Sequence, residues 1–254
     1  MPRREGRRLS GAPVLAIHGI GGGAYFFGDL GTRLAPACQL TTVELHALGP
    51  HSSSDSFTIE TWVDDLSELI RRSIGAPVAV IGHSLGTILA LKLWAAAPSF
   101  VRAIVCVGGL PEVRDAIRER LTPRIDLVRR DGLRGWGARV AAGVFSPATM
   151  RDRPEIVRDF ERRFEQQDAH AYARQIEQLL GASAVSIVPR VHVPVLCLTG
   201  ADDQYAPPEY VTAFAAHFCH PPEVAVIPDC GHQPFLEAPD ASARIVREFL
   251  ERIG

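Results

Sequence analysis

The pentapeptide Gly82-His83-Ser84-Leu85-Gly86 lies between a short apolar run, Val78 to Ile81, and a stretch of helical character, Leu85 to Ala97. Glycine two residues before and two residues after the serine permits the sharp turn that joins a strand directly to a helix. Such a turn exposes the serine hydroxyl at the edge of a sheet and leaves the next amide free. The stretch predicts a nucleophilic Ser84, with a glycine-flanked helix cap as the alternative.

Five further apolar runs have the same character as Val78 to Ile81. Each is rich in Val, Ile and Leu and does not alternate with polar residues, which is typical of strands buried on both faces of a parallel sheet. They are Val14 to Ile17, Leu40 to Leu45, Ala103 to Val107, Val195 to Leu198 and Val224 to Ile227. Further helices are expected at Phe57 to Ile74, Glu209 to Phe218 and Asp240 to Ile253. This alternation predicts a doubly wound α/β fold with a mostly parallel sheet of about six main strands.

One interval interrupts the alternation of strands and helices. Between Leu110 and Val188 the chain has arginine-rich amphipathic segments, such as Pro154 to Phe164 and Ala169 to Leu180, and no convincing strand. We therefore expect a helical lid over residues 110–188, inserted into a core made of residues 1–109 and 189–254. The arginines of this interval alternate with Asp and Glu, which favours solvated helix faces over an anion-binding role.

A nucleophilic serine needs a base, and the base needs an acid that orients it. His232 follows the last predicted strand, and Asp202 and Asp203 follow the strand before it. These loops lie at the same carboxyl edge of the sheet as Ser84, and the order Ser, Asp, His is the one expected on such a sheet. The positions predict His232 as the base and one of the two aspartates as its partner.

The loop His18-Gly19-Ile20-Gly21-Gly22-Gly23 follows the first predicted strand. Its glycines allow backbone amides to point into a site, and we expect the N–H groups of Ile20 and Leu85 to form an oxyanion hole. A phosphate-binding loop is the alternative. It is disfavoured because the chain lacks G-x-x-x-x-G-K-[ST] and has a single lysine, Lys92.

Four ordered motifs resemble those of α/β-hydrolases, from about Val14 to the C-terminus. They are the H-G-x-G of residues 18–21, the G-H-S-L-G of residues 82–86, the G-x-x-D that ends at Asp203, and Gly231-His232. The resemblance implies a Ser84–Asp203–His232 triad, with Asp203 rather than Asp202 as the acid. Glu237 and Pro239 match the family's G-H-x-x-x-x-E-x-P run. The family's usual N-terminal β-hairpin is missing here.

The stretch from Arg129 through Phe145-Ser146-Pro147 looks most like 3-oxoadipate enol-lactone hydrolases and related small carboxylesterases. This resemblance implies hydrolysis of a small ester or lactone by acyl transfer, without a cofactor. Trp136 and Phe145 are candidates for an apolar substrate pocket. Two alternatives stay open: hydrolysis of a carbon–carbon bond in a ring-fission product, and a ligand-sensing homologue. Gln233 departs from the Trp that often follows the histidine in carbon–carbon hydrolases.

Composition excludes several other classes of function. The chain has 254 residues, 46% of them hydrophobic, and a formal net charge of −2, so we expect no nucleic-acid partner. The basic residues at 3, 4, 7 and 8 are expected to form a solvated tail, and His46 and His51 to be exposed loop histidines. No apolar run is long enough to span a membrane, and no signal peptide is evident. Five cysteines without metal-ligand spacing indicate reduced thiols in a cytoplasmic chain without a metal site. Oligomeric state stays open.

Overall fold

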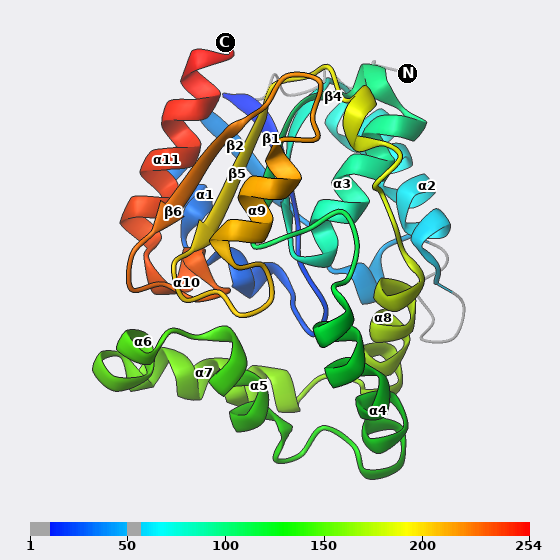
Figure 1. The fold of residues 1–254 in the computed structure, drawn as a ribbon. Coiled ribbons are helices and arrows are strands. Elements are labelled where there is room, and N and C mark those ends of the chain that lie inside the picture. The colour runs from blue at the N-terminus through cyan, green and yellow to red at the C-terminus, as the bar shows by residue number, and fades with distance from the viewer. Residues whose placement is uncertain (1–10, 50–56) are drawn as a thin grey trace, which may run out of the picture.

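The computed structural model describes residues 11–49 and 57–254 of the chain (Figure 1). Six strands form one sheet in the order β2-β1-β3-β4-β5-β6, and every neighbouring pair is parallel. The strands are β1 (Ala12–Ile17), β2 (Cys38–Thr42), β3 (Val78–His83), β4 (Val101–Val107), β5 (Val195–Gly200) and β6 (Glu223–Ile227). The predicted doubly wound α/β architecture with six main strands is confirmed. Both the basic residues at 3, 4, 7 and 8 and His51 lie outside the described residues.

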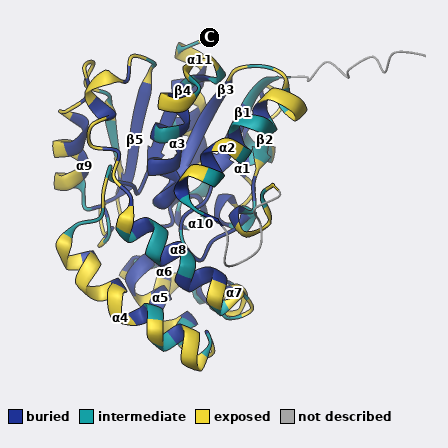
Figure 2. Ribbon diagram, turned by 90° about the vertical axis from the view of Figure 1, so that its right-hand side faces the viewer, coloured by how far each residue is buried: buried dark blue, intermediate teal, exposed yellow. Residues whose placement is uncertain are grey.

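Helices cover both faces of the sheet because alternate strand residues point to opposite sides. In β3, Val80 packs into one hydrophobic cluster and Ile81 into the other. The cluster of Val80 includes side chains of α2 (Ile59–Leu69), α3 (Leu85–Ala96) and α9 (Pro208–Ala215). The cluster of Ile81 includes those of α1 (Leu30–Leu34) and α11 (Pro239–Arg252). Figure 2 shows the buried central strands between these helices.

Helical residues between β4 and β5, which we call the helical insertion (residues 108–194), gather at one end of the sheet (Figure 1). Its helices are α4 (Asp115–Asp131), α5 (Trp136–Val144), α6 (Pro147–Asp152), α7 (Pro154–Glu165) and α8 (Ala169–Gly181). The two ends of the insertion meet, since the N–H of Ala184 donates to the carbonyl of Pro111 at 2.7 Å. The carboxyl ends of the strands point toward this insertion.

The remaining elements are short. They are η1 (Ala24–Phe27), η2 (Leu45–Ala47), η3 (Ile70–Ile74), η4 (Pro98–Phe100), η5 (Val188–Arg190) and α10 (Pro234–Glu237). Among the helices of the described ranges, none is long and apolar enough to cross a membrane.

The boundaries predicted for the second strand were wrong. The strand runs from Cys38 to Thr42 rather than from Leu40 to Leu45. β2 is an edge strand of which only Cys38 is buried, so a continuous apolar run does not mark it. Leu45 instead opens η2, where its N–H donates to Nε2 of His18 at 3.0 Å.

Backbone packs against backbone where α3 begins. A Cβ atom on Gly86 would lie 2.1 Å from the carbonyl oxygen of Ile17, and one on Gly82 would lie 2.2 Å from the carbonyl oxygen of Gly86. These carbonyls belong to a strand and a helix turn that cannot move independently. The first turn of α3 can therefore cross β1 this closely only because Gly86 has no side chain.

We expect Gly86→Ala to lower the free energy of unfolding by about 3 kcal/mol, because the added methyl group overlaps the backbone of β1. The matched control is Gly181→Ala in α8, where a Cβ atom would meet nothing within 4 Å. That substitution should leave stability unchanged or raise it by about 0.5 kcal/mol. Urea unfolding followed by circular dichroism measures both changes, and equal losses in the two variants would contradict the overlap at β1.

Candidate active site

Ser84 lies on the turn between β3 and α3 in a backbone conformation that L-residues rarely adopt. Its φ is 53° and its ψ is −116°. The turn is held by the Ser84 N–H, which donates to the carbonyl of Val107 at 2.9 Å, and by the Thr87 hydroxyl, which donates to the carbonyl of Gly82 at 2.9 Å. A strained conformation of this kind persists only where its surroundings enforce it, and such conformations cluster at functional sites.

His232 and Asp203 form a buried hydrogen-bonded pair. Nδ1 of His232 lies 2.8 Å from Oδ2 of Asp203, and the other carboxylate oxygen accepts from the N–H groups of Tyr205 and Ala206 at 2.8 and 2.9 Å. Burial alone would raise the pKa of Asp203, but His232 and these N–H groups outweigh it and lower the pKa. The ionised carboxylate fixes a proton on Nδ1 of His232 and leaves Nε2 as an acceptor.

The two aspartates that sequence reasoning left as candidates have different environments. Asp203 is 3% exposed and contacts His232, whereas Asp202 is exposed and its N–H donates to the carbonyl of Cys230 at 2.8 Å. The structure therefore brings Asp203, and not the Asp202 carboxylate, to His232.

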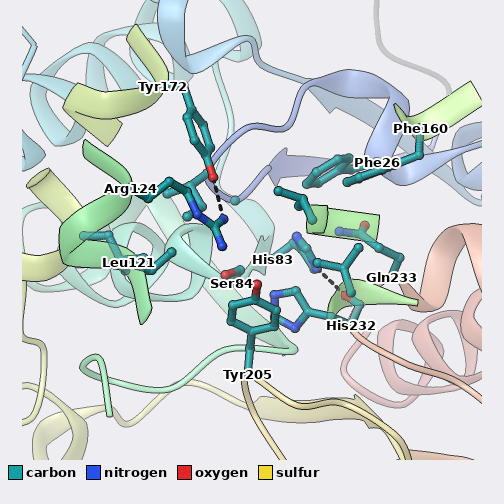
Figure 3. A pocket seen from close by; sticks show the side chains of 15 residues that line it. Phe26, His83, Ser84, Leu121, Arg124, Phe160, Tyr172, Tyr205, His232 and Gln233 are labelled. Atoms are coloured by element: carbon teal, nitrogen blue, oxygen red, sulfur yellow. Dashed lines mark hydrogen bonds between the residues drawn. The ribbon is translucent and has the colours of Figure 1, made fainter. Parts of the chain in front are cut away.

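Ser84 and His232 line the same cavity beneath the helical insertion (Figure 3). No hydrogen bond joins the Ser84 hydroxyl to His232 in the described structure, although both side chains face the same cavity. The cavity has a volume of about 40 Å³, room for about three water molecules. Ser84 also borders a second cavity of about 40 Å³, lined by Gly109, Val113 and Ile117.

Two backbone N–H groups next to Ser84 are without acceptors among the described residues. One belongs to Leu85, the first residue of α3, and the other to Ile20, which lines the Ser84 cavity. His18 positions the Ile20 loop, since its Nδ1 donates to the Gly19 carbonyl at 2.7 Å while Nε2 accepts from the Leu45 N–H. This arrangement requires a neutral imidazole, and burial lowers the pKa of His18 to about 4.

His83 packs beneath the loop of His232. Its Nε2 donates to the backbone carbonyl of His232 at 2.7 Å, and its Nδ1 is buried without a partner among the described residues. Burial lowers the pKa of His83 to about 3, so this imidazole is also neutral at physiological pH. Its position supports the loop of His232 from below.

Glu237 anchors the loop of His232 to the helical insertion. Its buried carboxylate accepts hydrogen bonds from the N–H groups of Gly231 and Gln233, both at 3.0 Å, and from the N–H of Ser146 at 2.8 Å. The N–H of His232 donates to the carbonyl of Val144 at 2.7 Å. The candidate base is therefore connected directly to the α5–α6 corner of the insertion.

Neither Trp136 nor Phe145 lines the Ser84 cavity. Phe145 is 2% exposed and packs edge-to-face on Phe160, which does line it, and Trp136 packs against Arg124. Sequence reasoning also missed lining residues that the insertion and the loops bring together: Phe26, Leu121, Arg124, Tyr172 and Tyr205. Figure 3 shows Arg124 and Tyr205 turned toward Ser84.

In the described part of the chain, no three His, Cys, Asp or Glu side chains lie close enough to share a metal ion.

We expect the two buried neutral histidines to make the fold sensitive to acid. Below pH 6.5 the unfolded chain protonates His18 while the folded chain does not, so stability falls as pH decreases toward the folded-state pKa of about 4. Between about pH 7.5 and about pH 5 each such histidine contributes a loss of about 2 kcal/mol. Chemical unfolding of His18→Gln should show a loss smaller by this amount. His220→Gln, at an exposed histidine that is not among the charged neighbours of His18, should match the unmodified chain. If the free energy of unfolding of His18→Gln changed with pH as much as that of the unmodified chain, a neutral His18 would be contradicted.

Comparisons with known proteins show the family to which the chain belongs. Residues 14–245 match the model of the alpha/beta hydrolase family. The chain is 26% identical to pimeloyl-(acyl-carrier protein) methyl ester esterase of Neisseria meningitidis, over 94% of each chain. Its fold is similar to that of a thermophilic esterase from Thermogutta terrifontis, with a TM-score of 0.88 and 20% identity over 96% of this chain and 91% of that one. It is also similar to the fold of the enol-lactonase from Burkholderia xenovorans, with a TM-score of 0.85 and 19% identity over 98% and 94%. The chain belongs to the alpha/beta hydrolase family.

Proposed function

We propose that the protein is a serine hydrolase that cleaves a small carboxylic ester or lactone, with Ser84 as nucleophile, His232 as general base and Asp203 as the orienting acid. The observation that carries this proposal is the buried His232–Asp203 hydrogen bond at 2.8 Å beside a serine held on a strained strand-to-helix turn. If Ser84 were only a helix cap, it would not need a neighbouring imidazole whose tautomer is fixed by an ionised carboxylate.

In the first step Oγ of Ser84 attacks the carbonyl carbon of the ester while its proton passes to Nε2 of His232. The carbonyl oxygen becomes an oxyanion, which accepts hydrogen bonds from the N–H groups of Ile20 and Leu85. The bond between the carbonyl carbon and the alcohol oxygen then breaks. The leaving alcohol takes the proton from His232, and the acyl group remains on Ser84.

In the second step a water molecule gives a proton to Nε2 of His232 and attacks the acyl carbon. Collapse of this second tetrahedral intermediate breaks the bond to Oγ of Ser84, which recovers its proton from His232. The products are a carboxylic acid and the free enzyme. Asp203 keeps the proton of Nδ1 in place throughout and stabilises the imidazolium in both steps.

We propose residues 110–188 as a lid over a core formed by residues 1–109 and 189–254. Support comes from the cavity itself, because Leu121, Phe160 and Tyr172 of the insertion line it opposite Ser84. A cavity of about 40 Å³ favours small substrates and entry by displacement of insertion helices. The named activities of the esterase, methyl ester esterase and enol-lactonase relatives support an ester or lactone as substrate.

The test is hydrolysis of p-nitrophenyl esters from acetate to octanoate. We expect activity to be highest on short chains, and Ser84→Ala to lower kcat by about a thousandfold or more because no other group can form the acyl intermediate. Retention of most of the activity by Ser84→Ala would refute the mechanism. A folded protein that cleaves none of the esters would refute the proposed reaction and favour carbon–carbon cleavage or ligand sensing.

A second variant separates catalysis from folding at Ser84. Because Ser84 has a φ of 53° and a ψ of −116°, Ser84→Gly relieves strain that Ser84→Ala keeps. We expect the glycine variant to be inactive and about 1 kcal/mol more stable than the alanine variant, as measured by urea unfolding. An alanine variant as stable as the glycine variant would show that the turn is not strained.

A further inference from the structure

Arg124 occupies an apolar position of helix α4. Ile117, Leu121 and Val128 form the buried stripe of this helix, and Arg124 lies between Leu121 and Val128 at the spacing of the same stripe. The residue is 5% exposed and lines the Ser84 cavity. In Figure 3 its guanidinium points from α4 toward Ser84. A charged group has therefore been placed where the helix otherwise buries aliphatic side chains.

No carboxylate pairs with this guanidinium among residues 11–49 and 57–254. One nitrogen, Nη1, donates to the hydroxyl of Tyr172 at 2.9 Å, and Nε is buried without a partner in the described chain. The ring of Trp136 lies 5.2 Å from the guanidinium carbon. Two other arginines of α4 do have carboxylate partners, since Arg129 pairs with Glu177 at 2.7 Å and Arg130 with Asp131 at 2.7 Å.

Burial of an unpaired positive charge is costly, and arginine cannot avoid the cost by losing its proton. Burial alone would lower the pKa of Arg124, but interactions with the hydroxyls of Tyr172 and Tyr205 outweigh it and raise the pKa. These two phenols and the ring of Trp136 hold the guanidinium in its charged form without supplying a negative charge. Among the described residues that line the cavity there is no Asp or Glu, and the carboxylate of Asp203 is already occupied by His232, Tyr205 and Ala206. The cavity therefore has a net positive end that an anionic ligand would neutralise.

We propose that the substrate carries a carboxylate that binds Arg124, at one end of the cavity in which Ser84 attacks the ester carbonyl. This inference rests on the proposed function and names its substrate class: esters or lactones with a free carboxylate. A guanidinium presents two parallel N–H donors that match the two oxygens of a carboxylate. Arg124 is the one arginine or lysine among the described residues that line the cavity, so a monoanion fits better than a phosphate dianion.

Kinetics on matched substrates test the proposal. The monomethyl esters of succinate, glutarate and adipate place a carboxylate on the acyl side, and 4-acetoxybutanoate places it on the alcohol side. Each has a neutral isostere in which an isopropyl group replaces the carboxylate, such as methyl 5-methylhexanoate for the glutarate ester. We expect kcat/KM to favour the anionic member of at least one pair by about tenfold or more.

Substitutions assign that preference to Arg124. The ratio of kcat/KM within the preferred pair should fall by about tenfold or more in Arg124→Gln, and Arg124→Lys should restore part of it. The control is Arg130→Gln, which removes an exposed charge from the same helix and should keep the ratio. A preference for the neutral ester in every pair, or a ratio that Arg124→Gln leaves unchanged, would overturn the proposal. A purely structural Arg124 would instead lower the melting temperature of Arg124→Gln while leaving the ratio unchanged.

Ligand binding separates failure of the substrate class from failure of the reaction. We expect butyrate to raise the melting temperature of Ser84→Ala and the neutral butyramide not to do so, with the butyrate effect absent from Ser84→Ala/Arg124→Gln. If butyrate binds in this way but no ester is cleaved by the unmodified chain, the carboxylate subsite stands and the proposed reaction fails. If esters are cleaved but butyrate and butyramide bind alike, the reaction stands and the subsite fails.

Discussion

Backbone packs on backbone where the first turn of α3 crosses the ends of β1 and β3, and the candidate site is positioned from this crossing. Gly86 approaches the carbonyl of Ile17 so closely that no side chain fits between them. Ser84, two residues before Gly86, has its strained positive φ at this crossing, and the amide of Leu85 lies at the start of the helix. Because β1 ends beside the same turn, the loop that carries Ile20 reaches Ser84 as well. The close approach at Gly86 thus places the Ser84 hydroxyl beside the N–H groups of Leu85 and Ile20, which have no acceptor among the described residues.

Much of this arrangement could be predicted from the sequence because its signals are local. Buried parallel strands are continuous apolar runs, and the loops after them meet at one edge, so the positions of Ser84 and His232 followed from chain order. The choice between Asp202 and Asp203 depended on a motif, since both follow the same strand and only the turn geometry buries one of them. The edge strand β2 was misplaced because one half-solvated face removes the apolar run.

Cavity-lining residues of the insertion could not be predicted in the same way. Alternation of arginine with acidic residues is typical of a solvated surface, and most arginines of the insertion do lie there. Arg124 differs from them only because it lies on the same helix face as Leu121 and Val128. That this face lines the cavity of Ser84 is known only from the structure. Trp136 and Phe145 show the converse, because aromatic character alone does not tell whether a ring faces a cavity or another helix.

Glu237 binds the loop of His232 and the α5–α6 corner of the insertion with one carboxylate. Gly231 and Gln233 are the two neighbours of His232, so the same carboxylate that binds the corner also fixes the backbone on both sides of the imidazole. The position of the His232 imidazole is therefore shared between the two parts of the chain: the sheet supplies the loop, and residues 144–146 of the insertion supply part of what holds it in place.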